Sequence, residues 1–298
     1  MKSKKHYLPD STFYITHSCN LTCNHCQTFN NKRFKGHYLW HKYEDEYKEW
    51  SKIVDLGLVN IHGGEPLTNP DILNWANGLK KLWPNAKEYT VSSNGTLLSK
   101  KKDLVIELVN KGWRWDVSIH DPITFDSILE SFLEIFQNFN IQVKDRKDGE
   151  KVVIDVKTNK TIATFLPQYY FFKNAFRYTK EGVVHMWRNN VDKSHRMCQY
   201  GFAELNNEYD HSPCRWFVAG KLFKCQLTAI TEDLIKQFTI EEEAVELLKK
   251  YKPASPYRPI EEIDDFIKNL DKPLDQCTLC PVSEILFPIY PLSKKKDV

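Results

Sequence analysis

The stretch STFYITHSCNLTCNHC, residues 11–26, joins an apolar segment to a loop that holds three cysteines. Residues 11–17 are rich in the aromatic and β-branched side chains typical of a buried strand. Cys19, Cys23 and Cys26 follow at once with C-x3-C-x2-C spacing. Parallel α/β proteins have their active sites on loops at the carboxyl ends of strands. The stretch therefore predicts a metal-binding or reactive loop after the first strand.

Strand-like and helix-like segments alternate beyond this loop. The hydrophobic periodicity predicts strands over 58–62, 87–93 and 113–120. It predicts helices over 43–54, from Pro70 with Asn69 as N-cap, near 100–111 and over 123–138. Residues 152–165 read as a β-hairpin that turns at Thr158 and Asn159. The expected fold class is α/β, a partial (β/α)6 TIM-like barrel over residues 1–185.

The pattern changes beyond residue 185, where five of the eight cysteines lie. Thr239 and Glu242 form a T-x-x-E capping box that predicts a helix start, and a short helix is expected at 260–270. The region 186–298 is therefore expected to be a small, cysteine-rich α+β domain. Its cysteines are Cys198, Cys214, Cys225, Cys277 and Cys280.

Composition indicates a soluble protein. The 298 residues are 41% hydrophobic and 13% aromatic, which is enough for a sizeable core. The formal net charge of +3 is spread through mixed-sign segments, so neither a nucleic-acid partner nor a membrane surface is expected. The N-terminus lacks a signal peptide, and a cytoplasmic location is expected. Cysteines clustered in a reducing compartment favour metal binding over disulfides.

The early cysteines admit two interpretations. Cys19, Cys23 and Cys26, with His25 as a fourth ligand, could bind zinc, although zinc sites usually pair C-x2-C with a distant second pair. An iron–sulfur cluster suits three thiolates better, because one iron can stay without a protein ligand. That iron is then open to a substrate or cofactor.

These residues resemble the radical S-adenosylmethionine enzymes, whose hallmark is a C-x3-C-x2-C loop after the first strand of a partial barrel. The resemblance implies that the three thiolates hold a [4Fe-4S] cluster and that its open iron binds S-adenosylmethionine. One electron from the cluster then cleaves this cofactor to a 5′-deoxyadenosyl radical. A reductant such as flavodoxin or ferredoxin is the implied partner.

The resemblance extends to the cofactor site. IHGGEP, residues 61–66, is similar to the family's GGE motif and implies that Gly63, Gly64 and Glu65 contact the amino end of the cofactor; alone, the glycines indicate only a tight turn. Asn94 and Ser118 are the implied contacts to its ribose or carboxylate. His25 lies where the family has an aromatic residue beside the adenine, or it is a solvent-facing loop residue. The family's glycine-rich fifth-strand motif is not recognisable.

Two histidines at strand ends are candidate acid–base groups. His62 and His120 each end a predicted strand on the side of the expected active site, and histidine exchanges protons near neutrality. A structural hydrogen-bonding role is the alternative for both. Asp121 before Pro122 is expected to cap the next helix.

The later cysteines are similar to the twitch or SPASM extension of the same family. The resemblance implies one auxiliary cluster with Cys214, Cys225, Cys277 and Cys280 as ligands. Only five residues separate Cys214 from Gly220, fewer than the family pattern has, so Cys198 is the other candidate for the fourth ligand. Cys198 is otherwise a catalytic thiol or a buried residue. A four-cysteine zinc site is the alternative to the auxiliary cluster.

The resemblance leaves the substrate open between two classes. A small molecule, such as a sugar or cyclitol that undergoes oxidation or rearrangement, is favoured because no leader-binding domain precedes residue 11. A peptide or protein side chain is the alternative. A hypothesis of another class is a zinc-stabilised binding module without catalysis, which predicts a basic, aromatic patch beside the cysteines.

Overall fold

The computed structural model describes residues 5–30, 34–172, 175–198, 215–282 and 286–289. The chain forms two compact units, and each is made of segments that are far apart in the sequence. Unit 1 comprises Met1–Tyr14, His41–Gly57 and Phe172–Phe287, and unit 2 comprises Ile15–Trp40, Leu58–Phe171 and Pro288–Val298. The domain boundary expected at residue 185 coincides with no limit of these units and stays a prediction.

Unit 2 is built on a mostly parallel sheet with the strand order β1-β2-β3-β4-β7-β6-β5. Strands β2, β3, β4 and β7 pair in parallel, whereas β5 and β6 add an antiparallel edge. The carboxyl-terminal parts of β1 and β2 belong to this unit. The bounds are β1 His6–Thr16, β2 Val54–Gly63, β3 Glu88–Ser93, β4 Arg114–Ile119, β5 Ile141–Asp145, β6 Lys151–Asp155 and β7 Lys160–Pro167.

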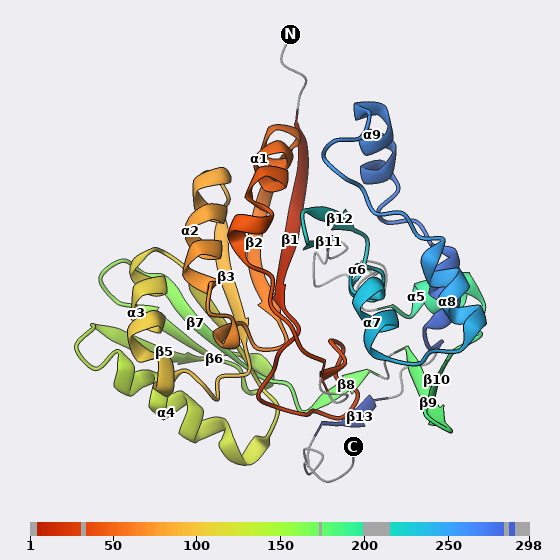
Figure 1. Ribbon diagram of the computed structural model, residues 1–298. Coiled ribbons are helices and arrows are strands. Elements are labelled where there is room, and N and C mark those ends of the chain that lie inside the picture. Colours follow the sequence, from red (N-terminus) through yellow and green to blue (C-terminus); the bar gives the residue numbers. More distant parts are fainter. Residues whose placement is uncertain (1–4, 31–33, 173–174, 199–214, 283–285, 290–298) are drawn as a thin grey trace. The chain divides into compact units, whose positions relative to one another are not determined.

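Helices α2 (Ile72–Leu82), α3 (Lys102–Asn110) and α4 (Phe125–Ile135) lie along one face of this sheet (Figure 1). Each buries an apolar stripe at helical spacing, such as Ile72, Trp75 and Leu79 on α2. The ring of Phe132 on α4 meets Phe165 on β7 edge to face, with 5.3 Å between centroids. Short 3₁₀ turns precede these helices at η3 (Pro66–Thr68), η4 (Ser99–Lys101) and η5 (Pro122–Thr124).

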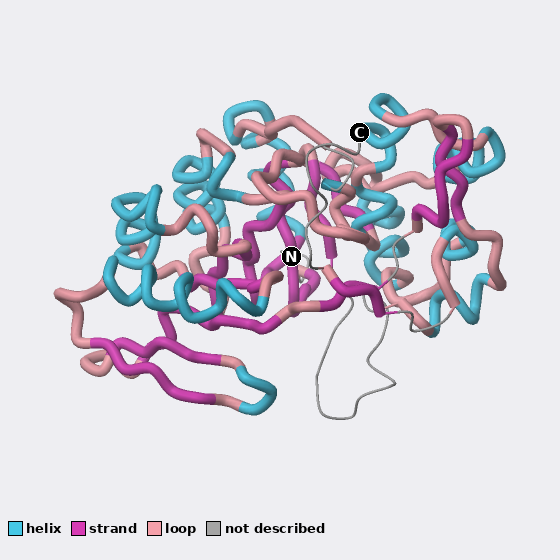
Figure 2. The backbone as a smooth tube through the Cα atoms, turned by 90° about the horizontal axis from the view of Figure 1, so that it is seen from below, coloured by secondary structure: helices cyan, strands magenta, loops and turns pink. Residues whose placement is uncertain are grey.

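The α/β class is confirmed, and the predicted hairpin is present as β6 and β7. After α4 the chain enters β5, η6 (Lys147–Gly149) and β6 rather than another strand–helix unit. Figure 2 shows β5 and β6 running side by side and joined by this short turn. The count of six strand–helix units therefore stays a prediction.

Unit 1 contains β11 (Arg215–Val218), which pairs in parallel with β1, and β12 (Lys221–Phe223), which is antiparallel to β11. Strands β9 and β10 form a separate antiparallel pair. Three short elements, η2 Trp40–Lys42, β8 Tyr170–Phe172 and β13 Leu286–Pro288, cross a limit between the units. The remaining elements of unit 1 are α1 Glu44–Ile53, β9 Phe176–Lys180, β10 Val183–Met186, α5 Val191–Arg196, α6 Gln226–Ala229, α7 Thr231–Gln237, α8 Glu242–Lys249, α9 Ile260–Lys268 and η7 Asp275–Leu279.

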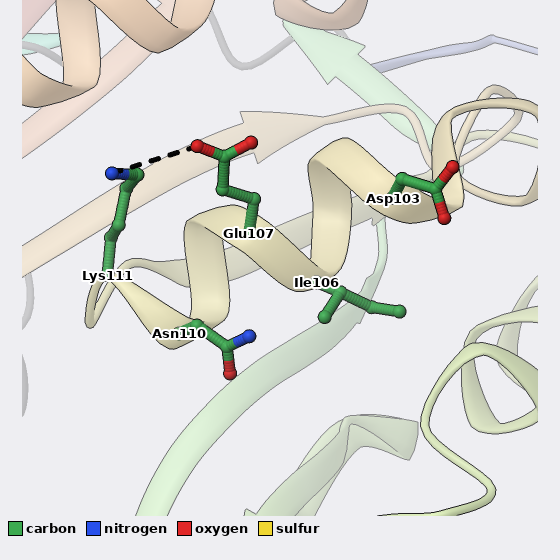
Figure 3. Close-up of a pocket in the computed structure, with 5 residues that line it drawn as sticks. All are labelled: Asp103, Ile106, Glu107, Asn110 and Lys111. Atoms are coloured by element: carbon green, nitrogen blue, oxygen red, sulfur yellow. Dashed lines mark ion pairs between the residues drawn. The ribbon is translucent and has the colours of Figure 1, made fainter.

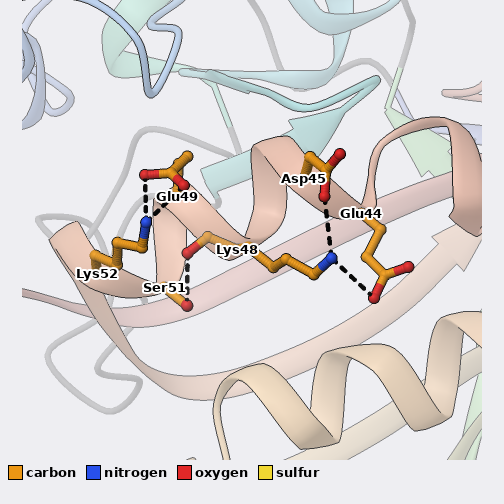
Figure 4. A network of polar contacts seen from close by, with 6 residues as sticks. All are labelled: Glu44, Asp45, Lys48, Glu49, Ser51 and Lys52. Atoms are coloured by element: carbon orange, nitrogen blue, oxygen red, sulfur yellow. Dashed lines mark hydrogen bonds and ion pairs between the residues drawn. The ribbon is translucent and has the colours of Figure 1, made fainter.

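Helix α1 shows how the sequence pattern forms an amphipathic helix in unit 1. Its buried face carries Tyr47 and Trp50, and the indole N–H of Trp50 donates to the carbonyl of Gly220 at 2.9 Å. Its exposed face carries a chain of ion pairs in which Lys48 lies 3.4 Å from Glu44 and 3.0 Å from Asp45 (Figure 4). Such exposed pairs contribute little to stability, so the buried aromatic face holds the helix in place.

Two expected helix starts are corrected by the structure. Helix α2 begins after Asp71, which is its N-cap residue; Asn69 accepts from the backbone N–H of Asp71 at 2.8 Å through Oδ1 and donates through its amide to the carbonyl oxygens of Ile15 and Tyr38. Helix α8 has Glu241 as its N-cap residue, so the predicted Thr239 capping box is not formed. Asp121 does accept from the backbone of Ile123, as expected. No helix within the described ranges is long and apolar enough to cross a membrane.

Candidate active site

The three early cysteines lie on the loop after β1. The side chain of Cys23 is 5% exposed, and Cys19 and Cys26 are partly exposed. Burial raises the pKa of Cys19 to about 12 and also raises the pKa of Cys23, and negative charge on Cys26 adds to both shifts. These thiols therefore stay protonated at neutral pH until a metal replaces the protons.

The loop closes through a tight local geometry. His25 has a φ of 55°, in the left-handed region that non-glycine residues rarely adopt. The backbone N–H of Cys26 donates to the carbonyl of Cys23 at 3.3 Å. The Cys26 sulfur lies 3.1 Å from Thr28 Oγ1 and accepts a long contact of 3.9 Å from Asn30 Nδ2. The loop therefore makes a tight turn between Cys23 and Cys26. The predicted contact of His25 with the adenine stays a prediction.

Gly63 and Gly64 allow the end of β2 to approach the backbone that enters the cysteine loop. The N–H of Gly64 donates to the carbonyl of Thr16 at 2.8 Å. A Cβ on Gly64 would lie 2.4 Å from the carbonyl oxygen of Ser18, and a Cβ on Gly63 would lie 2.7 Å from that of Thr16. Real side chains do not tolerate such distances from backbone, so both positions require glycine. The predicted contact of Gly63 and Gly64 with a cofactor stays a prediction.

Glu65 is fully buried and joins β2 to β3. Its carboxylate accepts hydrogen bonds from the backbone N–H of Leu67 at 3.1 Å and of Asn94 at 2.8 Å, and from the Ser93 hydroxyl at 3.0 Å. Burial raises its pKa to about 7, and these three donors partly oppose the shift. Sequence reasoning missed Ser93, which differs from neighbouring serines only in facing this carboxylate.

Asn94 connects this buried carboxylate to the cysteine loop. Its side-chain amide donates to the sulfur of Cys19 at 3.6 Å and to Asn20 Oδ1 at 3.0 Å. Its own Oδ1 accepts from the backbone N–H of Thr96 at 3.0 Å. A residue that was expected to contact the cofactor thus also holds a candidate cluster ligand.

The sheet face opposite α4 carries a band of polar residues. Parallel pairing sets Asn60 beside Thr90, and it sets Ser92, Asp116 and Thr164 in one row. Successive side chains of a strand point to opposite faces of the sheet, and Phe165 points toward α4. Thr164 and the residues in register with it therefore point to the face away from α4. We call this set the polar band: Asn60, His62, Thr90, Ser92, Asp116, Ser118 and Thr164.

His62 and Asp116 are the ionisable members of the polar band. Burial lowers the pKa of His62 to about 4, so its ring is neutral near pH 7. Burial raises the pKa of Asp116, and Arg114, 3.3 Å from its carboxylate, partly opposes that shift. Sequence reasoning missed Asp116 because only strand register brings it beside the other polar side chains.

His120 and Ser118 lie at the end of β4. The His120 ring donates from Nδ1 to the carbonyl of Gln168 at 3.2 Å, and burial lowers its pKa. Ser118 pairs with Leu166 of β7. The catalytic role of His120 and the cofactor contact of Ser118 stay predictions.

Four of the later cysteines come together in unit 1. Cys198, Cys225, Cys277 and Cys280 line one pocket. The Ser194 hydroxyl of α5 donates to the carbonyl of Cys280 at 3.0 Å, and Asn189 donates to the same oxygen at 2.9 Å. Burial raises the pKa of Cys280, and negative charges on the other three thiols add to the shift. Cys214, the predicted fourth ligand, lies outside the described residues.

The described cysteines do not form a preformed site for a single ion. Across the described segments, no three His, Cys, Asp or Glu side chains are arranged to hold one metal ion. A tetrahedral zinc with Zn–S bonds of about 2.3 Å requires sulfurs only about 3.8 Å apart. A cluster inserts irons and sulfides between its ligands and therefore accepts wider spacing. The early cysteines, with largely buried thiols and the Asn94 amide donating to the Cys19 sulfur, suit such a cluster.

Another hollow, of about 430 Å³, lies on the outer surface of α3 and lacks the features of an active site (Figure 3). Asp103, Ile106, Glu107, Asn110 and Lys111 line it, and all come from this helix and the residue after it. Glu107 and Lys111 form an ordinary i,i+4 ion pair at 3.7 Å. A shallow site on one helix does not gather groups for chemistry.

Comparison with known proteins gives one family match. The Radical SAM superfamily model matches residues 13–147. GTP 3′,8-cyclase of Petrotoga mobilis (strain DSM 10674 / SJ95) is 36% identical over 88 residues, 29% of this chain and 27% of that protein. Mycofactocin maturase MftC of Mycobacterium ulcerans (strain Agy99) is 37% identical over 60 residues, 20% of this chain and 16% of that protein.

Likeness to solved structures is remote. The crystal structure of BtrN in complex with AdoMet and 2-DOIA covers 93% of this chain and 86% of its own, with 13% identity and a TM-score of 0.43. Native anSMEcpe with bound AdoMet and Kp18Cys peptide covers 44% of this chain and 41% of its own, with 19% identity and a TM-score of 0.34. The chain matches about a quarter or less of the length of the two curated relatives.

Proposed function

We propose, from the premise that residues 13–147 form a radical SAM superfamily domain, that this chain is an enzyme that cleaves S-adenosylmethionine reductively and abstracts a hydrogen atom from a substrate. The observation that carries the proposal is the contact between the cysteine loop and the ends of two further strands. Gly64 meets the loop entrance through the Thr16 carbonyl, and Asn94 donates to Cys19. This is the arrangement that a cluster-binding loop needs.

Cys19, Cys23 and Cys26 would hold the [4Fe-4S] cluster through their sulfurs. Bound there, the cluster supplies the electron that splits S-adenosylmethionine into methionine and a 5′-deoxyadenosyl radical, which takes a hydrogen atom from the substrate. The protein's own residues bind and orient. Gly63, Gly64, Asn94, Ser118 and His25 are the proposed cofactor contacts.

Glu65 serves this site chiefly by positioning. Its carboxylate already accepts from Leu67, Ser93 and Asn94, and it has no exposed surface. It therefore fixes the backbone of the GGE turn and of Asn94 relative to one another. His62, neutral near pH 7, is proposed to accept a hydrogen bond from the substrate or the cofactor, with His120 as a second candidate acid–base group.

An auxiliary [4Fe-4S] cluster is proposed in a twitch-like region of unit 1. We assign Cys198, Cys225, Cys277 and Cys280 as its ligands, because these four line one pocket. The substrate radical would lose one electron to this cluster and a proton to solvent or to a protein base, which gives a net two-electron oxidation. A flavodoxin or ferredoxin is the proposed source of the electron for the first cluster.

The polar band supports a hydroxyl-rich small molecule, such as a sugar or cyclitol, as substrate. Its members offer amide, hydroxyl, imidazole and carboxylate groups, which hydrogen-bond hydroxyl groups well. Some of them already have protein partners, because Asn60 Oδ1 accepts from the hydroxyls of Thr90 and Ser92 and Asp116 pairs with Arg114. A peptide side chain is the second candidate, favoured by the local similarity to a maturase.

The test is anaerobic reconstitution with iron and sulfide, followed by reduction in the presence of S-adenosylmethionine. We expect a brown protein that releases methionine and 5′-deoxyadenosine in equal amounts. The C23S variant serves as the matched control and should release neither. A wild-type protein that holds iron and sulfide but produces no 5′-deoxyadenosine contradicts the proposal, and a colourless protein that holds zinc supports the binding-module alternative instead.

A further inference from the structure

A buried lysine lies against the four-cysteine pocket of unit 1. Lys224 follows β12 and directly precedes Cys225, and its side chain lines the pocket together with Cys198, Cys277 and Cys280. Lys224 is only 6% exposed. Its backbone N–H donates to the Tyr251 hydroxyl at 3.0 Å, which fixes the residue at this point of the chain.

The ammonium group of Lys224 has no partner in the part of the chain that the structure describes. Its Nζ atom is buried and makes no hydrogen bond there. A lysine is rarely buried unless it is paired, because removing an ammonium ion from water is costly. An apolar residue of similar volume would not carry this desolvation cost. A lysine at this position is therefore favourable only if a negatively charged partner lies inside the pocket.

The negative groups that act on Lys224 point to that partner. Among the described residues that line the pocket with Lys224 there is no Asp or Glu, whereas there are four cysteines. The counter-charge within the buried surroundings is therefore the group of thiolates, which forms only when a metal centre is bound.

We infer that Lys224 is the built-in counter-charge of the auxiliary centre, and that its ammonium donates hydrogen bonds to the sulfur atoms of a metal–thiolate cluster held by Cys198, Cys225, Cys277 and Cys280. This inference rests on the auxiliary cluster of the proposed function. A cluster with four thiolate ligands gains negative charge when it is reduced. A nearby cation stabilises the reduced form most and so raises the reduction potential.

The experiment uses the full chain with the C19A, C23A and C26A changes, so that only the auxiliary cluster contributes to the signal. The variants are K224M, which keeps the length of the side chain but removes its charge, and K224R, which keeps the charge. K236M is the matched control, because Lys236 is 70% exposed on α7. Midpoint potentials are measured by redox titration followed by electron paramagnetic resonance, at equal iron and sulfide content.

We expect K224M to lower the potential by about 59 mV or more, which is a tenfold change in a one-electron reduction equilibrium. K224R should lie close to the wild type, and K236M should not differ from it. Melting temperatures give a second readout, in which the metal-free and the cluster-loaded chain should shift in opposite directions. K224M should raise the melting temperature of the metal-free chain, because an unpaired buried charge is removed, and should lower it in the loaded chain.

Equal potentials for K224M and the wild type at equal cluster content would overturn the inference and leave the auxiliary cluster intact. If the starting variant binds no iron and sulfide, the auxiliary cluster itself fails, and the inference fails with it. The two failures differ in iron content and are read separately. If K224M does not fold, K224Q replaces it as a smaller polar change without charge.

Discussion

The side-chain amide of Asn94 donates to the sulfur of Cys19 at 3.6 Å across 75 residues of chain. The backbone N–H of the same Asn94 donates to the buried carboxylate of Glu65 at 2.8 Å. One residue at the end of β3 therefore joins the first candidate cluster ligand to the GGE turn after β2. The relative positions of the cysteine loop and the GGE turn depend on this residue.

We expect N94L to lower the reduction potential of the first cluster, because hydrogen bonds to ligand sulfur raise such potentials. Leucine has a similar volume but no amide, so the donor to Cys19 is lost. The measurement is a redox titration of the cluster in the C198S, C277S background, which lacks ligands of the auxiliary centre. N74L on the exposed face of α2 is the control, and equal potentials for N94L and the wild type would contradict this assignment.

The G64A substitution should prevent the cysteine loop from closing. Its new Cβ would lie 2.4 Å from the Ser18 carbonyl oxygen and 2.7 Å from that of His17, and backbone cannot move away cheaply. Overpacking of this kind costs roughly 1–3 kcal/mol of stability. Urea unfolding of the metal-free chain and iron uptake measure the two effects. G182A is the matched control, because nothing lies within 4 Å of its new Cβ and only its positive φ of 79° opposes the change.

The stability of the metal-free chain should fall as the pH drops from about 6.5 towards 4, in part because of His62. Its pKa is about 4 in the folded chain against an ordinary value of 6.5 for histidine, so the unfolded chain binds the proton first. The stabilising contribution is complete above the unfolded pKa and is lost as the pH falls through the folded one. We expect the H62Q variant to lose less stability than the wild type as the pH falls from 6.5 to 4.

The check is the urea midpoint measured at a series of pH values. H41Q is the control, because His41 is exposed and its replacement should leave the limb unchanged. An H62Q profile parallel to that of the wild type between pH 6.5 and 4 would show that the surroundings of His62 do not lower its pKa.

C198S should lose the auxiliary cluster, whereas C214S should retain it. Cys198 lines the same pocket as Cys225, Cys277 and Cys280, and α5 holds it there through the contact of Ser194 with the Cys280 carbonyl. Iron and sulfide content after reconstitution in the C19A, C23A, C26A background distinguishes the two variants. If C198S retains the cluster and C214S loses it, the ligands are Cys214, Cys225, Cys277 and Cys280, as the resemblance to the family implies.

The sequence alone determined the features that depend on neighbours in the chain. The spacing of Cys19, Cys23 and Cys26 directly after a strand predicted the loop, and the apolar periodicity predicted α1, α2, α3 and α4. These features depend on local periods of two and 3.6 residues, which are visible in any short window. The GGE turn was identified by its resemblance to a family motif, because two adjacent glycines alone indicate only a tight turn.

Local signals were less reliable where the tertiary structure offers a competing partner. Asn69 lies two residues before the N-cap of α2, where its Oδ1 accepts from the backbone N–H of Asp71 while its amide reaches the carbonyl oxygens of Ile15 and Tyr38. The Thr239 box was not formed because α8 starts after Glu241, whose carboxylate accepts from the backbone N–H of Met186. In each case the helix start is accompanied by long-range hydrogen bonds that the local motif does not predict.

Only the tertiary structure decided which distant residues meet. Strand register joined Asn60, Ser92 and Asp116 into the polar band, and the packing of α5 brought Cys198 to the C-x2-C turn of Cys277 and Cys280. The burial of Lys224 beside these thiols has no signature in sequence, where it is one of many lysines. Such meetings depend on pairing register and packing over long separations, which no short window of sequence contains.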